Sequence, residues 1–582
     1  MTARAWTTRS LLTSIVLAGF AVRLWGLTFG LPIVSARPDE LVIVVTALRF
    51  LSEGNLNPRF FDYPGLFLYL VGAIYLVYYA IGRGLGWFDS IPHFVGGTHG
   101  RWPMLYFLNR FASALFGTLT IVWLYRTARR LFGETAGLLA ALFLAFAFLH
   151  VRDSHYGTTD AALVFFTVCA IHALVLLNGE RRRSHAVRAG IFAGLAMGAK
   201  YNSLLLVAPM FVVEAGHAWS RRDRPRELLR TTYLPWMLGL MLVTFLATSP
   251  YLIIDYRHAL RDFEALGSSM SGGMTPRDLL GPGWLYHVRF SLFHGVGWPM
   301  LLAAFAGAAV MLFRHAFLAL LLLAYPLAYY AVAGASANVF VRYMLPVVPF
   351  VCLFAAYFVD AVASWGAAHL STARAAADRE GPQAARPHKP APAARLRVFR
   401  AGLAAALGLA VVAPSAWSVY HFDRILSQRD NRLVASDWVH EHVAFGSSVF
   451  MTGNSYGYPP LEDRRNPKWR LIGWDWAGMR FIENGHPFEG WPDWIVVQRS
   501  ALPYSHIPDP VEAALPKQYS LAQVIRAGDV RHPANVYDIQ DAFYMPYGGF
   551  RNIRRPGPNF EIYQRRPEMV PPDAAAEPPP TR

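Results

Sequence analysis

Residues 35–45 read SARPDELVIVV and place two adjacent acids, Asp39 and Glu40, directly after the first apolar segment of the chain. Acidic side chains are costly near a bilayer and persist mainly where a cavity needs them, so this pair marks the centre of the chemistry. Pro38 suits the first turn of a helix, which would put both acids at its positive N-terminal end, where an ionised carboxylate is favoured. The two side chains would point about 100° apart, so only one is expected to face a cavity. Ordinary helix-terminal charge at a membrane interface is the alternative interpretation.

The composition is that of a polytopic α-helical membrane protein. Of the 582 residues, 54% are hydrophobic and only 16% are charged, and the mean hydropathy is +0.27, which is too apolar for a soluble enzyme. The net charge of +16 does not indicate nucleic acid as a partner, because the arginines form short clusters between apolar segments and not one basic face. Cys169 and Cys352 fall inside apolar segments, so no disulfide framework is expected.

The apolar segments define the predicted topology. The first, from about Leu11 to Val34, is too long for a signal-peptide core and is interpreted as a retained signal anchor. Two later segments, 187–199 and 203–219, are short and would have to turn around Lys200, whereas one long span there would invert everything downstream. Spans are predicted near 105–125, 135–150, 161–178, 187–199, 203–219, 233–252, 293–313, 316–334, 343–362 and 401–419. With the anchor, this gives about eleven spans, an internal N-terminus and an external C-terminus.

Arginine clusters decide which side of the membrane each loop occupies. They follow the predicted spans at 126–130, 181–188 and 221–230, and loops rich in Lys and Arg stay in the cytoplasm. All of them share the side of the N-terminus only if the apolar segment 64–82 does not span. We therefore predict that this segment is a juxtamembrane helix that lies in or dips into the outer leaflet, inside a long first external loop over residues 35–103.

The C-terminal third differs from the membrane domain, which is assigned to residues 1–420. A cytoplasmic linker is assigned to residues 363–400. Its segment STARAAADREGPQAARPHKPAPAARLR (371–397) is rich in Ala, Pro and Arg and is expected to be disordered. Residues 421–570 are predicted to form a small soluble α/β domain outside the cytoplasm, with a disordered tail over 571–582. A helix is expected at NRLVASDWVHEHV (431–443), and strands are expected at SSVFMT (447–452), DWIVVQ (493–498) and NFEIYQRR (559–566). The tryptophans of this C-terminal domain could stack on sugar rings or pack its core.

Five short motifs lie along the membrane domain. They are ARPDE at 36–40, FDYPGLFLYL at 61–70, RDSHYGTTDAALVFF at 152–166, GLAMGAKYN at 194–202 and FVRYMLPVVP at 340–349. In this order and spacing, the motifs resemble the C-type (GT-C) superfamily of membrane glycosyltransferases, nearest the protein O-mannosyltransferase and lipid A aminoarabinose transferase branch. The resemblance covers roughly residues 10–360. It implies a GT-C fold, a sugar donor on a polyprenyl phosphate, an acceptor from the external side and a catalytic base at the first-loop aspartate, Asp39.

Direct displacement of a polyprenyl phosphate needs one proton acceptor. Glycosidases normally use two carboxyl groups because a sugar or alcohol leaving group must be protonated, whereas a phosphate leaves as an anion that fixed cations can stabilise. The candidates for binding the donor phosphate are Arg342 and Tyr343, at the external start of a span, and Lys200. Arg342 could instead snorkel to the interface, and Lys200 could be structural. Arg152 is equally explained as an interfacial charge.

Four residues are predicted to position the acceptor or the catalytic acid: Asp160, His155, Asp62 and Tyr63. Asp160 could equally cap the helix that it opens. His155 has no partner at metal-ligand spacing, so no metal is assigned, although a divalent ion stays open. Asp62 and Tyr63 stand where the resemblance would place Glu-Lys or His, and Gly65 replaces a proline, so this segment does not identify the sugar.

The preferred hypothesis is an inverting glycosyltransferase of the bacterial inner membrane. It would move one sugar from a polyprenyl phosphate to an external protein, lipid A or cell-envelope glycan, and no cofactor is predicted. A lipid or glycan transporter or flippase is an alternative of another class, but transporters usually show repeated halves, and we see no repeat in this sequence. A non-catalytic assembly protein whose external domain binds glycan is a third possibility.

Overall fold

The computed structural model describes residues 3–33, 36–96, 102–223, 231–269, 276–380, 393–461, 468–541 and 543–567. The chain divides into two compact units. The helical unit comprises Met1–Leu27 and Val42–His421, and the C-terminal unit comprises Thr28–Leu41 and Phe422–Arg582. The short segment Thr28–Leu41, which carries the acidic pair, therefore belongs to the C-terminal unit and not to the helical one.

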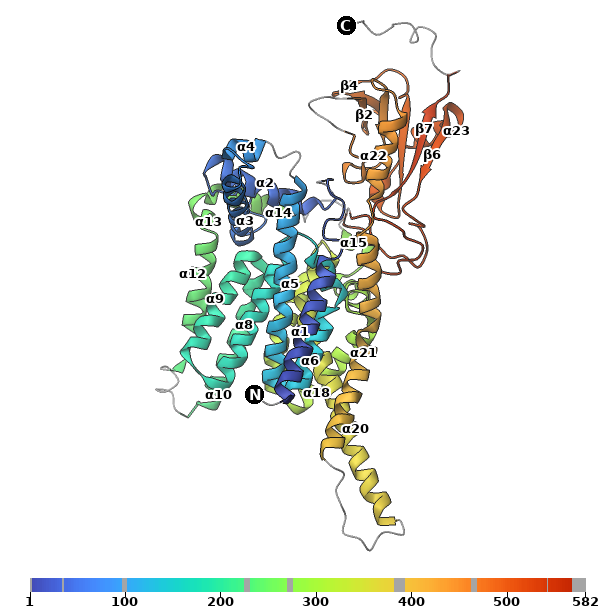
Figure 1. The fold of residues 1–582 in the computed structure, drawn as a ribbon. Coiled ribbons are helices and arrows are strands. Elements are labelled where there is room, and N and C mark those ends of the chain that lie inside the picture. Colours follow the sequence, from blue (N-terminus) through green and yellow to red (C-terminus); the bar gives the residue numbers. More distant parts are fainter. Residues whose placement is uncertain are drawn as a thin grey trace. The chain divides into compact units, whose positions relative to one another are not determined.

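Helices make up the helical unit (Figure 1). In chain order, its described elements are α1 (Ala3–Leu24), α2 (Pro38–Glu53, which begins in the C-terminal unit), α3 (Gly65–Gly84), α4 (Ile91–Gly96), α5 (Trp102–Phe132), α6 (Glu134–Ala145), α7 (Phe148–Ser154), α8 (Asp160–Glu180), α9 (Arg183–Ala199), η2 (Tyr201–Leu206), α10 (Val207–Ser220), α12 (Leu234–Thr248), α13 (Tyr251–Ile254), α14 (Tyr256–Ser269), α15 (Pro276–Leu280), α16 (Gly283–Tyr286), η3 (His287–Leu292), α17 (Phe293–Val296), α18 (Trp298–Arg314), α19 (Ala316–Ala335), η4 (Val341–Val347), α20 (Val348–Glu380) and α21 (Ala393–Leu426, which ends in the C-terminal unit).

Within the described residues, seven helices are long and apolar enough to cross a membrane, or up to nine if each of two bent pairs counts as one span. All of these except α3 coincide with predicted spans. Three further helices were predicted to span: α1 forms but ends at Leu24 and not near Val34, and α9 and α12 have only 17 and 15 residues. The anchor helix ends early because turns follow it, with Gly26 and Gly30 at φ values of 85° and 68° that other residues rarely adopt.

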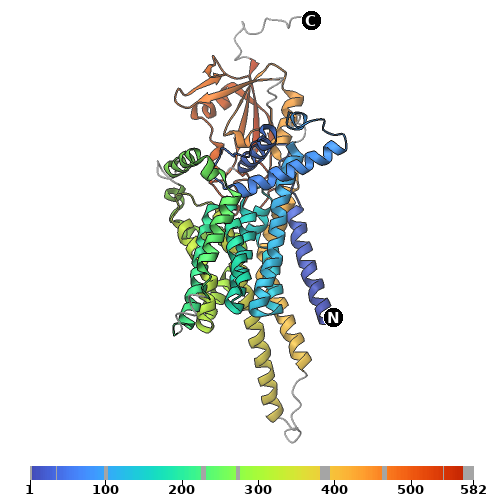
Figure 2. The same cartoon turned by 90° about the vertical axis from the view of Figure 1, so that its left-hand side faces the viewer.

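Helix α3, the segment predicted not to span, lies across the bundle. Figures 1 and 2 both show it running over the ends of α5, α8 and α9, at the end of the helical unit opposite to the start of α1. The Tyr75 hydroxyl on α3 donates a hydrogen bond of 2.9 Å to the carbonyl of Leu105 near the start of α5. Although α3 has the length and hydropathy of a span, its direction agrees with the predicted juxtamembrane helix.

The arginine clusters gather at the other end of the helical unit. Arg130 at the end of α5 lies 3.0 Å from Glu180 at the end of α8, and Arg181 lies 3.0 Å from Glu214 on α10. Because α9 starts beside Arg181 and α10 ends near Glu214, these two helices run in opposite directions on either side of Lys200. The predicted turn at Lys200 is therefore confirmed. Residues 224–230 of the third cluster lie outside the described residues.

The predicted disordered linker is wrong for most of its length. Helix α20 continues to Glu380, and α21 begins at Ala393. Alanine and arginine are strong helix formers, so the run STARAAADRE extends α20. Residues 381–392 of that linker and the tail predicted over 571–582 lie outside the described residues.

The C-terminal unit contains a seven-stranded sheet in the order β4-β3-β2-β1-β5-β7-β6. Its elements are α22 (Asn431–His442), β1 (Ser448–Met451), η5 (Ser455–Gly457), β2 (Arg470–Asp475), β3 (Arg480–Glu483), β4 (His486–Pro487), β5 (Trp494–Arg499), η6 (Pro503–Ser505), α23 (Asp509–Gln518), β6 (Tyr519–Ile525) and β7 (Asn559–Arg565). The predicted helix and all three predicted strands are confirmed as α22, β1, β5 and β7. Strand β1 pairs in parallel with β2 and β5, and buried residues of alternating strand positions pack two apolar cores.

Small residues set the close packing of α9 on α12. A Cβ added at Gly190 or Gly194 would lie 2.7 Å from the Met237 carbonyl oxygen or 2.6 Å from that of Met241. This spacing of small residues every four positions lets two helix backbones approach, as is common between membrane helices. The packing fixes the C-terminal end of α9, where Lys200 follows.

We expect Gly194→Leu to destabilise the helical unit, because the new side chain would meet the backbone of α12 and overpacking costs about 1–3 kcal/mol. Thermal unfolding of the purified chain in detergent should show a lower Tm. Gly239→Leu on α12 is the matched control, since a Cβ at Gly239 meets nothing within 4 Å. Equal Tm values for the two variants would contradict the packing argument.

Candidate active site

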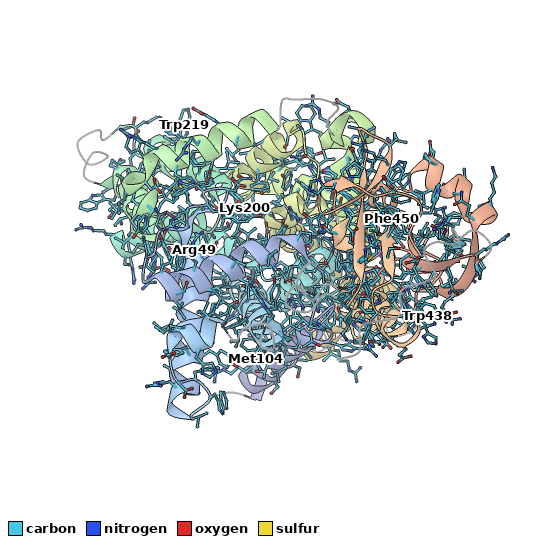
Figure 3. All side chains as sticks on the ribbon, turned by 90° about the horizontal axis from the view of Figure 1, so that it is seen from above. Arg49, Met104, Lys200, Trp219, Trp438 and Phe450 are labelled. Atoms are coloured by element: carbon cyan, nitrogen blue, oxygen red, sulfur yellow. The ribbon has the colours of Figure 1, made fainter. Side chains whose placement is uncertain are left out.

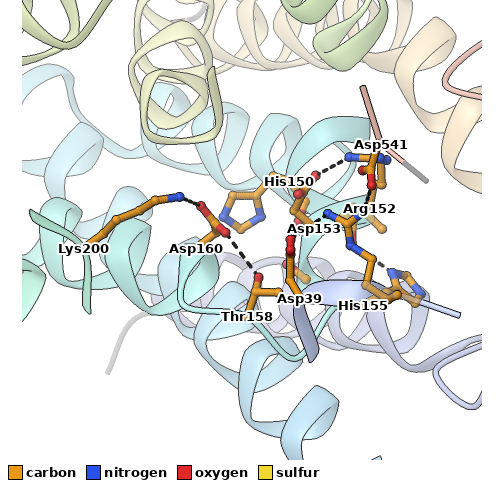
Figure 4. Close-up of polar contacts among 12 residues, drawn as sticks. Asp39, His150, Arg152, Asp153, His155, Thr158, Asp160, Lys200 and Asp541 are labelled. Atoms are coloured by element: carbon orange, nitrogen blue, oxygen red, sulfur yellow. Dashed lines mark hydrogen bonds and ion pairs between the residues drawn. The ribbon is translucent and has the colours of Figure 1, made fainter. Parts of the chain in front are cut away.

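A buried ion pair joins the start of α8 to the end of α9. Asp160 is the first residue of α8, and Lys200 follows the last residue of α9 in an extended conformation. The Lys200 Nζ donates to Asp160 Oδ1 at 2.6 Å, and the Thr158 hydroxyl donates to Asp160 Oδ2 at 3.3 Å (Figure 4). Only 14% of the Lys200 side chain and 6% of the Asp160 side chain are exposed. Asp160 therefore does more than begin a helix: it supplies the counter-charge of a buried lysine.

The segment η4 brings two more predicted residues to this pair. The Lys200 Nζ lies 6.0 Å from the centre of the Tyr343 ring, and the charge of Arg342 acts on both Asp160 and Lys200. The Arg342 guanidinium itself lies 4.3 Å from the centre of the Phe340 ring. Seen along the bundle, Lys200 lies within the helical unit, whereas Trp219 lies at its rim (Figure 3). Four residues predicted from three separate motifs are thus brought together.

The FDYP segment lies beside the same region. The Tyr201 hydroxyl, one residue after Lys200, donates to the Phe61 carbonyl at 2.9 Å. The Phe61 amide donates to Asp262 Oδ2 on α14, also at 2.9 Å. Asp62 as a whole residue is exposed, but its carboxyl group is partly buried. This burial, together with the charge of Asp262, raises the pKa of Asp62.

Tyr63, which follows Asp62, has a packing partner within the first loop. Its ring packs edge-on against that of Phe60, with ring centres 5.6 Å apart.

Asp262 was not among the residues predicted from the sequence. The sequence feature that could have indicated Asp262 is the charged segment YRHALRDFEAL (256–266), whose acidic and basic side chains follow a predicted span on the external side.

His155 ends α7 in a fully buried position. Its Nδ1 and Nε2 lie 2.9 Å and 3.1 Å from the carbonyl oxygens of Val151 and Trp25. Burial lowers the pKa of His155 to about 4, so the ring is neutral at neutral pH. These contacts hold α7 to the residue that follows α1, and the positioning role expected of His155 from the sequence stays a prediction.

The neighbouring pair Arg152 and Asp153 is also buried. Arg152 Nη1 lies 3.1 Å from Asp153 Oδ2, with 3% and 1% of the two side chains exposed (Figure 4). Arg152 also lies over the Tyr156 ring at 5.3 Å. An ordinary interfacial arginine would reach water, so the interfacial interpretation of Arg152 is wrong.

The acidic pair lies in the C-terminal unit, and α2 begins at Pro38 as predicted. The two acids differ in environment: Glu40 is fully buried, whereas 27% of the Asp39 side chain is exposed. Arg37 Nη2 lies 3.5 Å from Asp39 Oδ2, and Arg37 Nη1 also forms an ion pair with Asp541. The sequence reasoning missed both Arg37 and Asp541. Arg37 stood within the quoted motif, but no sequence signal linked it to a residue so far along the chain.

Metal binding gains no support from side-chain grouping. Over the described parts of the chain, no cluster of three or more His, Cys, Asp or Glu residues is arranged to hold a metal ion.

Comparison with known proteins assigns the matched region to a class. Residues 105–254 match the family model described as dolichyl-phosphate-mannose-protein mannosyltransferase. This match includes the loop before α8, the helices α8 and α9, and Lys200. The resemblance to C-type membrane glycosyltransferases expected from the motifs is thereby confirmed.

A relative from Corynebacterium matches part of the chain. The polyprenol-phosphate-mannose–protein mannosyltransferase of Corynebacterium glutamicum is 35% identical over an alignment of 228 residues. The alignment covers 32% of this chain and 42% of the relative. The chain therefore spans less than half the length of this relative. Among solved structures, apo ArnT from Cupriavidus metallidurans aligns with a TM-score of 0.49 and 15% identity, over 98% of this chain and 100% of that one. AglB from Archaeoglobus fulgidus aligns with a TM-score of 0.48 and 14% identity, over 78% of this chain and 63% of AglB.

Removing Lys200 alone should destabilise the chain. Lys200→Met would leave the buried Asp160 carboxylate without its ammonium partner, and breaking a buried pair in this way costs about 3–5 kcal/mol. Thermal unfolding in detergent should show a fall in Tm that the double variant Lys200→Met/Asp160→Asn largely reverses. Additive losses in the double variant would contradict a direct pair.

The raised pKa of Asp62 predicts a pH-dependent effect on stability. Because the folded chain holds this proton more tightly than the unfolded chain, ionisation of Asp62 destabilises the fold as pH rises through the folded pKa. Asp62→Asn should therefore raise Tm at pH about 7.5 and have little effect at pH about 4. Asp89→Asn, at an exposed acid, is the control, and a stabilisation that is larger at the lower pH would refute the assignment.

Proposed function

We propose that this chain is an inverting glycosyltransferase that moves one sugar from a polyprenyl-phosphate donor to an acceptor outside the cytoplasm. The observation that carries the proposal is the meeting of Lys200, Arg342 and Tyr343 with the buried Asp160, within the same unit as the matched mannosyltransferase segment. Fixed cations of this kind stabilise the charge that develops on a departing phosphate. Arg342 can bind phosphate through two hydrogen bonds, and Lys200 supplies a point charge.

In this proposal, Asp39 is the base. The acceptor hydroxyl gives its proton to the Asp39 carboxylate while its oxygen forms a bond to the anomeric carbon. The bond between that carbon and the phosphate oxygen breaks, and its electron pair leaves with the phosphate, which Arg342 and Lys200 hold. No general acid is required, because the leaving group departs as an anion. A single displacement inverts the anomeric configuration.

The remaining roles are assigned by position. Asp160 keeps Lys200 charged and oriented, while Asp62 and Tyr63, in the first loop, are assigned to the acceptor side. Glu40 is assigned to support the helix start, because it is fully buried. The name of the Corynebacterium glutamicum relative, a polyprenol-phosphate-mannose–protein mannosyltransferase, makes polyprenyl-phosphate mannose the donor, and a protein the acceptor, to test first.

We place the chain in the bacterial inner membrane as a multi-pass protein. The arginine-rich end of the bundle, where α1 starts, would face the cytoplasm, since basic loops stay inside. Helix α3 would then lie along the outer surface and not span, with about eleven spans in all when α1, α9 and α12 are included. The C-terminal unit would be extracytoplasmic.

Asp39→Asn should abolish transfer while leaving folding and donor binding intact. We expect a loss of about 10²–10⁴-fold in kcat, the usual contribution of a positioned base. The measurement is transfer of labelled mannose from polyprenyl phosphate in membranes that contain the full chain. Glu53→Gln, at the other end of α2, is the matched control and should behave as wild type. Near-normal transfer by Asp39→Asn would remove Asp39 from the mechanism.

A further inference from the structure

The segment before the acidic pair is built into the C-terminal unit. Phe29 is buried and packs edge-on against Phe543, with ring centres 5.6 Å apart. Gly30 adopts a φ of 68°, and a Cβ there would lie 2.4 Å from the Cβ of Ala36. The segment therefore follows a tight path that brings Arg37 and Asp39 to a fixed place on this unit.

Arg37 lies between two carboxylates. Its guanidinium forms an ion pair with Asp541 through Nη1 and lies 3.5 Å from Asp39 through Nη2. The Arg37 side chain is 1% exposed and that of Asp541 is 7% exposed, whereas that of Asp39 is 27% exposed. The buried half of this arrangement is thus the Arg37–Asp541 pair, and the accessible half is the acid to which catalysis is assigned.

Asp541 is itself held by a hydrogen-bonded turn. Its amide donates to the Asp538 carbonyl at 3.2 Å, and the Gln540 amide donates to the Asp538 carboxylate at 3.3 Å. The Tyr504 hydroxyl donates to the Gln540 carbonyl at 2.7 Å. Burial and the charges of Asp541 and Asp538 raise the pKa of Tyr504 to about 12, so this hydroxyl keeps its proton. The turn gives Asp541 a defined orientation toward Arg37.

We infer that Asp541 is a positioning residue that controls the direction of the Asp39 carboxylate through Arg37. This inference rests on the proposed role of Asp39 as the base. A buried guanidinium requires a counter-charge, and Asp541 supplies it from the side away from the exposed acid. Without Asp541, Arg37 would turn to Asp39 and could bind both of its oxygens. A carboxylate held in this way is turned from the direction that it has beside the Arg37–Asp541 pair.

The expected effect falls on the chemical step. Asp541→Asn should lower kcat by about 10- to 100-fold, the scale of a small misplacement of a catalytic group. The KM for the donor should stay near wild type, because the cations assigned to the phosphate are unchanged. A merely structural role of Asp541 would not produce this split between a lowered kcat and an unchanged KM. Asp541→Glu, which keeps the charge, should recover part of the rate.

The test uses the full chain in membranes with labelled polyprenyl-phosphate mannose as donor. Asp437→Asn is the control, because Asp437 is an exposed acid of the same unit paired with Arg429. A wild-type kcat for Asp541→Asn, with Asp39→Asn inactive, would overturn the inference and leave the proposed function standing. Near-normal transfer by Asp39→Asn would remove Asp39 as the base and this inference with it, whereas no transfer by the wild-type chain would overturn the proposed function. If Asp541→Asn does not accumulate as folded protein, Asp541→Glu decides: a lowered kcat at unchanged KM supports the inference, and a wild-type kcat overturns it.

Discussion

A lysine ammonium inside an apolar helical unit requires a carboxylate within contact distance, and much of the local structure around Lys200 follows from this constraint. Lys200 interrupts the helical path with an extended residue, and Asp160 opens α8 at the point where its carboxylate reaches that ammonium. The small residues of α9 let this helix pack closely on α12, which fixes the depth at which Lys200 emerges. The ion pair, the ends of α8 and α9 and the close packing of α9 on α12 therefore together determine where the Lys200 ammonium lies.

The sequence predicted this location better than it predicted the number of spans. A lysine among small residues, between two short apolar segments, is an exception in a membrane domain, and exceptions of this kind reveal where charge must be compensated. The pairing of Lys200 with Asp160 could not be derived from spacing alone, because 40 residues and a helical hairpin separate the two side chains. Span counting was weaker because hydropathy does not fix where a helix ends. Helix α1 ends at Leu24 and not near Val34, and α9 and α12 have only 17 and 15 residues.

Contacts between distant parts of the chain limited the rest of the prediction. Arg37 and Asp541 are 504 residues apart, and a lone aspartate near the end of an α/β domain has no sequence feature that links it to Arg37. The same holds for Asp262, which contacts the backbone of the first loop from α14. The linker was misjudged for a different reason: its alanine and arginine content suits a flexible tether and a helix equally, and neighbouring helices determine which one forms.

Two of the charged groups assigned to the reaction, Asp39 and Lys200, have a counter-charge within their own units. Asp39 has Arg37, which Asp541 holds, and Lys200 has Asp160. Electrostatic energies are large and poorly screened in buried surroundings, so a change to one group is felt first by its own partner. A substitution at Arg37 or Asp541 should therefore disturb Asp39 first and leave the charge balance between Lys200 and Asp160 unchanged.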